Sequence, residues 1–467
     1  MTRVHFIGIG GSGLSAIARL LQESGYTVTG SDRLLSPFAV ELQKQGVRVH
    51  IGHQAQNVAG ADWVVRSSAV ADDNPEVIAA RAAGIPVLKR ADFLGQLMQD
   101  KVGISVAGTH GKTTTTAMLA WTLTALGQEP SFIVGGVLNN LGVNARAGKG
   151  QTFVIEADEY DRMFLGLKPA IEVVTNVEHD HPDYYPTPED FFASFLDFVR
   201  LLPADGLLVA CADDPGATRL MEHARRLGKR VASYGLTAED APVRAREPQP
   251  NEKGGFTFQA DVHGQSFVVP LMVPGRHNVL NALAVLTVCE ALGLPMGEVT
   301  AALAQFSGTG RRFELRGQAG GVIVYDDYAH HPTEIRATLA AARARHADRR
   351  IWAVWQPHTY SRTRALFDEF IRAFGDADEV IVTEIYRARE PQQDFSALQV
   401  VQAMSHRSAH FIAELKDVSA YLVSHLRPGD VLLVLSAGDA DQVSAQVLAH
   451  LHESEVPDDQ ERTTSHV

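Results

Sequence analysis

The chain has 467 residues, of which 45% are hydrophobic and 21% are charged. This composition is that of an ordinary globular protein, and the length predicts about three domains of ~150 residues each. The formal net charge of -13 argues against nonspecific binding to DNA, RNA or anionic lipid. Any affinity for phosphate therefore has to come from a local site.

The cysteines and the apolar runs indicate the compartment. Cys211 and Cys289 each lie within an apolar run, which predicts core residues in a reducing compartment and no disulfide framework. The N-terminal apolar stretch is too short and too glycine-interrupted for a signal peptide, and no apolar run approaches the ~18 residues of a transmembrane helix. We expect a cytoplasmic protein with no membrane insertion and no nucleic-acid partner.

Residues 1–100 alternate short apolar strands with helices, the pattern of an open parallel sheet. The strand Val4–Ile9 leads through a G-x-G-x-x-G turn into a helix over Leu14–Glu23. This arrangement is typical of a Rossmann unit for a dinucleotide, and it would serve a UDP-sugar equally well, because both ligands carry a diphosphate attached to a ribose. The residues expected to contact such a ligand are Gly8, Gly10, Gly11, Ser12, Gly13, Asp32, Ser67 and Ser68.

The strongest single signal lies at 103–117, where an apolar strand runs into the turn Gly108–Gly111 and then into a helix. Glycines let backbone N–H groups approach phosphate oxygens, and the helix N-terminus adds a positive dipole. Lys112 can bridge the terminal phosphates, and the Thr113 hydroxyl can reach Mg²⁺. Val106 stands where the Walker pattern has a glycine, but a purely structural turn would not need the lysine. We interpret this stretch as a clamp for a nucleoside triphosphate.

Two buried strands of the middle section, 101–307, run into polar clusters. Residues 156–161 include four acids, and residues 175–183 combine acids with histidines. Carboxylates at strand ends beside a phosphate loop suggest ligands for a hard cation, and Mg²⁺ bound with waters and phosphates is a simpler assignment than zinc. Farther along, residues 243–270 predict a β-rich insertion, and an apolar helix follows Pro274.

The last section, 308–453, again alternates strands and helices and predicts a third α/β unit. Its expected strands are Val322–Tyr325, Ile351–Trp355, Glu379–Thr383 and Val431–Leu435. Polar segments at 326–334, 356–364 and 436–439 follow three of these strands, where α/β sheets place ligand residues. Residues 454–467 are polar and acidic and contain proline, which predicts a disordered tail.

Taken in order, the motifs resemble those of the Mur ligase family. They are FIGIGGSGLS, GTHGKTTTT, EADEYD, TNVEHDHPD, GRHNVLNALA, GTGRRFE, DDYAHHPTE and QPHTYSRTR, and together they cover nearly the whole chain. The resemblance implies a three-domain α/β protein. An N-terminal Rossmann-like domain (1–100) would bind a UDP-sugar, a central P-loop ATPase domain with a parallel sheet (101–307) would bind ATP, and a C-terminal Rossmann-like domain (308–453) would bind an amino acid.

Within the family, the resemblance implies an enzyme of peptidoglycan biosynthesis that joins L-alanine to the lactyl carboxylate of UDP-N-acetylmuramate. A carboxylate is unreactive toward amines at neutral pH because its oxygen is a poor leaving group. ATP with Mg²⁺ would convert it to an acyl phosphate, which the amine attacks, releasing phosphate beside ADP. The resemblance leaves open whether the enzyme is a monomer or a homodimer.

The resemblance also implies roles for the matching residues. ATP would be bound by Gly108, Thr109, His110, Gly111, Lys112, Thr113, Asn278, Asn281 and Arg312, and the metal by Thr113, Glu156 and His181. The amino acid would be bound by Tyr328, His330, His358 and Arg362, and catalysis would depend on Lys112, Glu156, His181, His330 and Arg312. We expect Lys112→Ala to abolish turnover while preserving the fold.

Two departures from the pattern keep a second reaction open. Thr359 stands where the alanine-adding members usually carry arginine, which leaves recognition of the amino-acid carboxylate to Arg362 or Arg364. Tyr160 stands where many members have serine, and a tyrosine at this position resembles the tripeptide ligases of cell-wall recycling. The sequence of the first glycine loop instead favours the alanine-adding members. A third alternative, an NAD- or nucleotide-binding module without ligase activity, does not explain both acidic clusters together with the C-terminal histidines.

Overall fold

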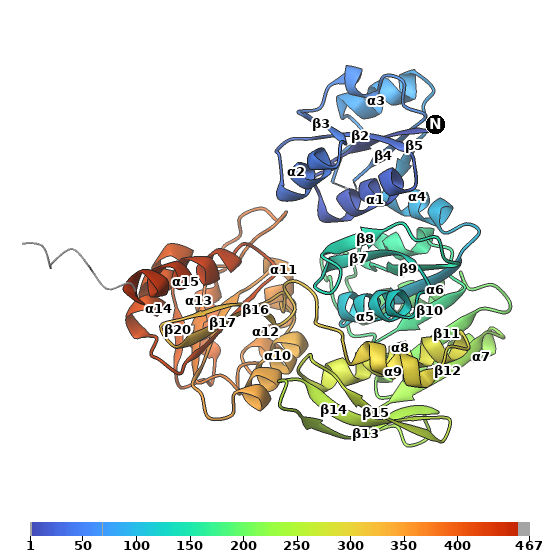
Figure 1. Ribbon diagram of the computed structural model, residues 1–467. Coiled ribbons are helices and arrows are strands. Elements are labelled where there is room, and N and C mark those ends of the chain that lie inside the picture. The colour runs from blue at the N-terminus through green and yellow to red at the C-terminus, as the bar shows by residue number, and fades with distance from the viewer. Residues whose placement is uncertain (1, 68, 456–467) are drawn as a thin grey trace, which may run out of the picture.

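The structure, a computed structural model, describes residues 2–67 and 69–455. These residues form three α/β domains, each with its own sheet, which confirms the predicted fold class (Figure 1). Ser68 and residues 456–467, which include most of the predicted tail, lie outside the described residues. No helix in the described part of the chain is both long enough and apolar enough to cross a membrane.

The N-terminal domain is a five-stranded parallel sheet with the strand order β3-β2-β1-β4-β5. Its strands are β1 (Arg3–Ile7), β2 (Thr27–Asp32), β3 (Arg48–Ile51), β4 (Trp63–Arg66) and β5 (Val87–Lys89). Its helices are α1 (Ser12–Glu23), α2 (Pro37–Lys44), η1 (Ala55–Val58), α3 (Pro75–Ala82) and α4 (Arg90–Leu97). This order is that of half a Rossmann fold, in which ligands bind beyond the carboxyl ends of the central strands.

The central domain contains a mixed sheet of ten strands in the order β15-β14-β13-β12-β11-β10-β6-β9-β7-β8. The strands are β6 (Val102–Ala107), β7 (Ser131–Leu138), β8 (Val143–Arg146), β9 (Thr152–Glu156), β10 (Ile171–Val174), β11 (Leu207–Cys211), β12 (Arg230–Gly235), β13 (Val243–Pro250), β14 (Phe256–Val262) and β15 (Gln265–Pro270). The helices are α5 (Lys112–Ala125), η2 (Tyr160–Gly166), α6 (Pro188–Val199), α7 (Pro215–Arg226), α8 (Arg276–Ala291) and α9 (Met296–Leu303). The strands around β6 are parallel, and the predicted β-rich segment forms the antiparallel strands that extend one edge of the same sheet.

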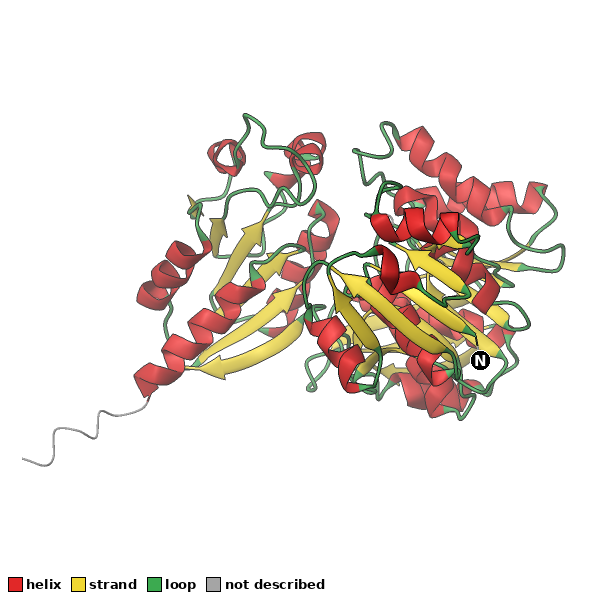
Figure 2. Ribbon diagram, turned by 90° about the horizontal axis from the view of Figure 1, so that it is seen from above, coloured by secondary structure: helices red, strands yellow, loops and turns green. Residues whose placement is uncertain are grey.

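The C-terminal domain contains six strands in the order β16-β17-β21-β18-β19-β20, with only β16 antiparallel to its neighbour. The strands are β16 (Glu314–Ala319), β17 (Val322–Asp327), β18 (Ile351–Gln356), β19 (Glu379–Val382), β20 (Ala409–Phe411) and β21 (Val431–Ser436). The helices are α10 (Pro332–Arg345), α11 (Tyr360–Ala365), α12 (Phe367–Phe370), α13 (Ala397–Ala403), α14 (Leu415–His425) and α15 (Asp441–Glu455). Every residue of β18 and β21 is buried, because helices cover both faces of the sheet (Figure 2).

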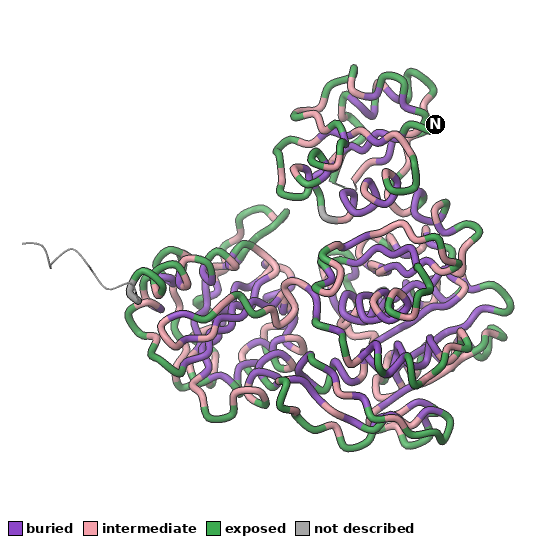
Figure 3. The backbone as a smooth tube through the Cα atoms, in the orientation of Figure 1, coloured by how far each residue is buried: buried purple, intermediate pink, exposed green. Residues whose placement is uncertain are grey.

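Burial follows the sheets. Figure 3 shows buried backbone along the strands at the centre of each domain and exposed backbone in the surrounding loops. Helix α8 is buried on almost every side, because it packs against α5 and α9 on one side and the strands β11–β14 on the other. A helix enclosed in this way needs apolar residues all round, which is the pattern that the sequence shows after Pro274.

Helix α4 connects the N-terminal and central domains. The Phe93 ring lies edge-on to Phe6 and Trp63 of the N-terminal domain, at centroid distances of 6.3 and 5.7 Å. On the other side of the helix, Gly95 lies against the backbone of Gly166 in η2. A Cβ at either glycine would overlap backbone atoms of the opposing segment. The two domains therefore meet at a contact that leaves no room for a side chain.

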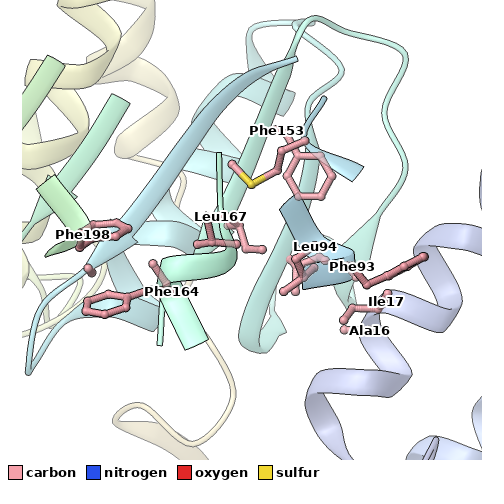
Figure 4. Packing of buried hydrophobic residues seen from close by; sticks show 14 of the residues in the cluster. Ala16, Ile17, Phe93, Leu94, Phe153, Phe164, Leu167 and Phe198 are labelled. Carbon is pink, nitrogen blue, oxygen red and sulfur yellow. The ribbon is translucent and has the colours of Figure 1, made fainter. Parts of the chain in front are cut away.

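Figure 4 shows the apolar part of this junction. Phe93 and Leu94 of α4 lie beside Ala16 and Ile17 of α1, and Phe164 of the central domain belongs to the same buried cluster. One continuous core thus crosses the boundary between the first two domains. Burial of apolar surface contributes roughly 25 cal/mol per Å², so this junction holds the two domains together as a unit.

Candidate active site

The phosphate clamp lies where β6 ends and α5 begins. Gly108 and Gly111 have φ angles of 131° and 82°, and a Cβ at Gly108 would overlap the Thr175 hydroxyl. Glycine is therefore required at both positions for backbone conformation, and a Cβ at Gly111 would also lie only 2.6 Å from Asn281 Oδ1. The Thr109 hydroxyl donates to the Glu178 carbonyl at 2.7 Å and accepts from the Glu178 N–H at 2.9 Å, which fixes the loop.

Lys112, the first residue of α5, forms a buried ion pair. Its Nζ donates to Glu159 Oε1 at 2.9 Å and to the carbonyl oxygens of Gly108 and Thr109 at 2.7 and 3.1 Å. Burial lowers the pKa of Lys112, but Glu159, Asp158 and Glu156 together outweigh it and the pKa is raised. The lysine is therefore positively charged and fixed within the phosphate clamp, as the sequence predicts.

The predicted metal ligands fall into two groups. The Thr113 hydroxyl donates to Glu156 Oε1 at 3.0 Å, and the other oxygen of this carboxylate accepts the Gly135 N–H at 2.6 Å. His181 instead lies 3.6 Å from Glu159 Oε1 and 3.7 Å from Asp180 Oδ2. The hydroxyl and carboxylate oxygens of Thr113 and Glu156 are hard ligands that suit Mg²⁺ bound together with water and phosphate.

A cavity of about 670 Å³ opens beside the clamp and is lined by His110, Thr113, Asn278, Asn281 and Arg312 among others. The Asn278 side chain donates to the Pro274 carbonyl at 2.7 Å, and Asn281 donates to Asn278 Oδ1 at 3.0 Å. A pocket of this size next to a phosphate loop suits a nucleotide. Six of the nine residues that the sequence assigns to ATP line this cavity, whereas Gly108, Thr109 and Lys112 do not.

Arg312 connects this cavity to the C-terminal domain. Its guanidinium lies 5.2 Å from the centroid of the Tyr328 ring and 3.9 Å from Glu334 Oε1. Asp327, which the sequence analysis did not single out, also lines the cavity and accepts the N–H groups of Phe313 and Ala329 at 2.8 and 2.7 Å. Burial raises the pKa of Asp327 to about 6, as it does for carboxyl groups in functional sites.

The four residues assigned to the amino acid lie together. The rings of Tyr328 and His330 are 5.5 Å apart, and those of His330 and His358 are 6.0 Å apart. Arg362 Nη1 lies 3.1 Å from His358 Nδ1. By contrast, Arg364 extends away and stacks on Phe395 at 4.6 Å, so Arg362 is the arginine of this group.

Arg362 also links the amino-acid group to the central domain. Its Nε donates to Asp180 Oδ1 at 2.8 Å, both side chains are 4% exposed, and Nη2 lies 3.3 Å from His181 Nδ1. Burial raises the pKa of Asp180, but Arg362, His181 and His330 together outweigh this effect and hold the pKa well below its usual value. Asp180, which was not predicted as a site residue, therefore joins His181, a predicted metal ligand, to the residues assigned to the amino acid.

His110 of the clamp forms a second link between these domains. Its Nε2 lies 2.8 Å from Glu178 Oε2 and its Nδ1 lies 3.2 Å from Glu334 Oε1, while Thr333 Oγ1 donates to Glu178 Oε1 at 2.9 Å. Burial lowers the pKa of His110, but the hydrogen bonds to the two carboxylates raise it to about 9. Glu178 and Glu334 were missed, although each belongs to a motif that the sequence analysis quoted.

Within the described residues, His110, Glu178 and His331 are the one group of three or more histidine, cysteine or acidic side chains close enough to share a metal ion. Both nitrogens of His110 already face carboxylates. His331 Nδ1 accepts the Thr333 N–H at 3.3 Å, so its Nε2 carries the proton. The hydrogen bonds therefore favour an ion-pair network here and not a metal centre.

The first glycine loop is organised by Asp32. Asp32 Oδ2 accepts the Gly10 N–H at 2.8 Å, and the Gly8 N–H donates to the Ser31 carbonyl at 2.8 Å. Ser67 lies against Gly8, where a Cβ would approach to 3.2 Å. The predicted contacts Gly8 to Gly13, Asp32 and Ser67 are thus adjacent, whereas Ser68 and the side chain of Ser12 lie outside what the structure describes.

The chain matches three family models that follow one another along its length. They are the Mur ligase family, catalytic domain (residues 3–102), the Mur ligase middle domain (106–289) and the Mur ligase, glutamate ligase domain (311–438). The chain belongs to the Mur ligase family. Membership implies that this Mur ligase uses ATP, in agreement with the clamp and its adjoining cavity.

Similar proteins extend along nearly the whole Mur ligase chain. The UDP-N-acetylmuramate--L-alanine ligase of Geotalea daltonii is 44% identical over 459 residues, which cover 97% of this chain and 98% of that protein. The structure is similar to the UDP-N-acetylmuramate-alanine ligase of Thermotoga maritima (29% identity, TM-score 0.81, covering 97% of this chain and 100% of that one). It is also similar to a murein peptide ligase of Psychrobacter arcticus (27% identity, TM-score 0.71, covering 97% and 99%).

Proposed function

We propose that this Mur ligase joins L-alanine to the lactyl carboxylate of UDP-N-acetylmuramate, converting ATP to ADP and phosphate through an acyl phosphate, in peptidoglycan synthesis. The alanine-ligase relatives at 44% identity support this activity. The observation that carries it is a direct contact between the residues assigned to the amino acid and the residues beside the phosphate clamp. Arg362 of the amino-acid group hydrogen-bonds to Asp180 and His181 beside the phosphate clamp.

The first step is phosphoryl transfer to the lactyl carboxylate. Both the attacking carboxylate and the phosphoryl group are anionic, so positive charge has to offset their repulsion. Lys112 supplies one charge in the clamp and Arg312 a second at the edge of the cavity. Thr113 and Glu156 would hold Mg²⁺, which supplies further charge neutralisation when it is bound.

In the second step, His330 is suited to accept the proton that the amine loses. Its Nδ1–H donates to the Tyr328 carbonyl at 2.9 Å and lies 3.4 Å from Glu334 Oε2, which leaves the lone pair on Nε2. Burial lowers the pKa of His330 to about 3, with Arg362 and His358 adding to the effect and Glu334 opposing it. The imidazole therefore enters the reaction neutral.

The proton transfer balances as follows. The neutral amine of L-alanine attacks the acyl carbon, the N–C bond forms and the bond from carbon to the phosphate oxygen breaks. The adduct nitrogen is far more acidic than a free ammonium group, so His330 Nε2 can take its proton. Because the pKa of His330 is about 3 even with Glu334 beside Nδ1, the imidazole does not keep this proton but passes it to the departing phosphate oxygen.

The assay of phosphate release tests this function. We expect release to require UDP-N-acetylmuramate and L-alanine together with ATP, and to stop when Mg²⁺ is chelated. Tyr160 favours a second candidate, the murein tripeptide ligase, because many alanine-adding members have serine at this position; its hydroxyl lies 3.2 Å from Asp183 and Arg389 lies over its ring. Release with the tripeptide but not with L-alanine would establish that candidate instead. We further infer a cytoplasmic location, where these nucleotide substrates are available.

A further inference from the structure

Arg90, the first residue of α4, is a cation without a counter-ion. Its Nε is buried and has no hydrogen-bond partner, and no ion pair within the described residues includes its guanidinium. Burial lowers the pKa of Arg90, and the negative charges of Asp158 and Glu156 offset this only in part. A guanidinium carries five N–H donors; Arg90 is only partly buried, but its Nε–H is enclosed and has no acceptor, which is costly. Such a group is expected where a ligand supplies the acceptors.

The guanidinium of Arg90 lies against the first glycine loop. A Cβ at Gly13 would overlap its Nη1 and Cζ atoms. Gly13 does not have a positive φ, so glycine at this position provides space and not an unusual backbone conformation. The last glycine of the G-x-G-x-x-G turn therefore makes room for a side chain from a segment more than seventy residues farther along the chain.

The loop itself lacks the charge that a diphosphate needs. It offers backbone N–H groups and the N-terminal dipole of α1, but there is no lysine or arginine from Gly8 to Ala18. Of the nearby cations, Arg66 is paired with Asp72 at 3.1 Å, and Arg33 is exposed. A guanidinium is also the group that binds phosphate oxygens in a bidentate manner.

We propose that Arg90 binds the diphosphate of the UDP-sugar, so that this group lies between the glycine loop and the start of α4. The proposal deepens the proposed function and rests on it, because it assigns a residue to that substrate. Gly95 and Gly166 fix α4 in the junction of the first two domains, so Arg90 is held at a constant position. Contact with Gly13 favours the diphosphate over the other anionic group of the substrate, the lactyl carboxylate.

Calorimetric titration of the full chain with UDP tests the proposal in the absence of ATP and L-alanine. We expect Arg90→Gln to weaken UDP binding by about tenfold or more, because charge-assisted hydrogen bonds to the diphosphate are lost. Arg90→Lys should recover part of the affinity, since lysine keeps the charge but cannot donate two parallel hydrogen bonds as a guanidinium does. The matched control is Arg48→Gln, an exposed arginine of β3 in the same domain, which should bind UDP as the unmodified chain does.

Two results would overturn the proposal. Unchanged UDP binding in Arg90→Gln would show that the guanidinium does not contact the diphosphate. Weaker binding of UDP-N-acetylmuramate with unchanged binding of UDP and UDP-N-acetylglucosamine would assign Arg90 to the lactyl carboxylate. Thermal unfolding of each variant separates lost affinity from lost structure, and Arg90→Lys carries the test if Arg90→Gln does not fold. Failure of the phosphate-release assay would leave the UDP result standing, so the two proposals fail separately.

Discussion

The chain uses a strand, a glycine turn and a helix twice, at Gly8–Gly13 and at Gly108–Gly111, and the two turns acquire their charge in different ways. The second turn carries its own cation, since Lys112 follows it directly and is fixed by Glu159. The first turn has no lysine or arginine, and Arg90 of α4 lies against it. The positive charge beside the glycine turn thus comes from the turn's own segment in the central domain and from a second segment, α4, in the N-terminal domain.

This difference fits the two ligands. A triphosphate that transfers its terminal group needs a cation fixed at the point of reaction, and a lysine at the helix N-terminus meets that need. The diphosphate of a UDP-sugar only has to be held, so a cation from the domain junction is sufficient. The second turn is also tied to the C-terminal domain through His110 and Glu334.

The largest effect is expected for Lys112→Ala, which should lower kcat by about 10³-fold because it removes the cation of the clamp. The sequence analysis expects this variant to keep its fold, but the free energy of unfolding should also fall. The reason is that Glu159 is left buried without its partner, at a cost of about 3 kcal/mol. Phosphate release and thermal unfolding measure the two effects. The double variant Lys112→Ala/Glu159→Gln should regain stability and stay inactive, and near-normal turnover in either variant would contradict the clamp.

The link through His110 predicts a dependence on alkaline pH. Its pKa is raised to about 9 from 6.5, so its contribution to stability is complete below pH 6.5 and is lost as the pH rises through 9. After allowance for the exposure of Glu178, the loss is on the order of 2 kcal/mol. Thermal unfolding from pH 6.5 to 9.5 should show this decline, and His110→Gln should remove it. The exposed His410→Gln is the control, and an identical decline in His110→Gln would count against the link.

Alanine substitutions separate what glycine does in the two turns. Gly111→Ala should cost about 1–2 kcal/mol, because its φ of 82° is unfavourable for alanine. Gly13→Ala should change the unfolding free energy by less than about 0.5 kcal/mol, since only the flexible end of Arg90 has to move, but it should weaken UDP binding. Urea unfolding and UDP titration of both variants test this. Equal losses of stability would mean that the two glycines serve the same purpose.

The smallest effect is expected at Asp32. Asp32→Ala leaves the Gly10 N–H without its acceptor, which should weaken UDP binding by about fivefold, the equivalent of one hydrogen bond. The KM for ATP should stay constant, because the clamp is in another domain. A change in the KM for ATP with unchanged UDP binding would show that Asp32 acts on the ATP site and not on the UDP site.

The sequence predicts the elements well where local chemistry determines them. Four strands of the C-terminal domain, β17, β18, β19 and β21, lie where apolar runs predict them, whereas β16 and β20 were not predicted. Lys112 and Thr113 can be assigned in advance because a phosphate turn dictates their positions. These features depend on residues close together in the chain.

The unpredicted residues depend on contacts between domains. Glu178 and Asp180 lie in a cluster that suggests metal ligands, yet the structure pairs them with His110 and Arg362. No local pattern specifies which cation an acid will meet across a domain boundary. Arg90 leaves no signal for a different reason, since the partner that we propose for it is a ligand and not another residue. Whether His181 binds metal, and how each remaining residue acts, stay predictions.

The contact between Gly95 and Gly166 limits which substitutions these two positions can tolerate. A backbone-to-backbone contact can be kept only by glycine, because any side chain would separate the two segments. The pair Asp180–Arg362 can change in steps that preserve a charge on each side. In a library of random substitutions, positions 95 and 166 should therefore be the least variable of this enzyme's domain junctions, although neither is among the residues assigned to a substrate.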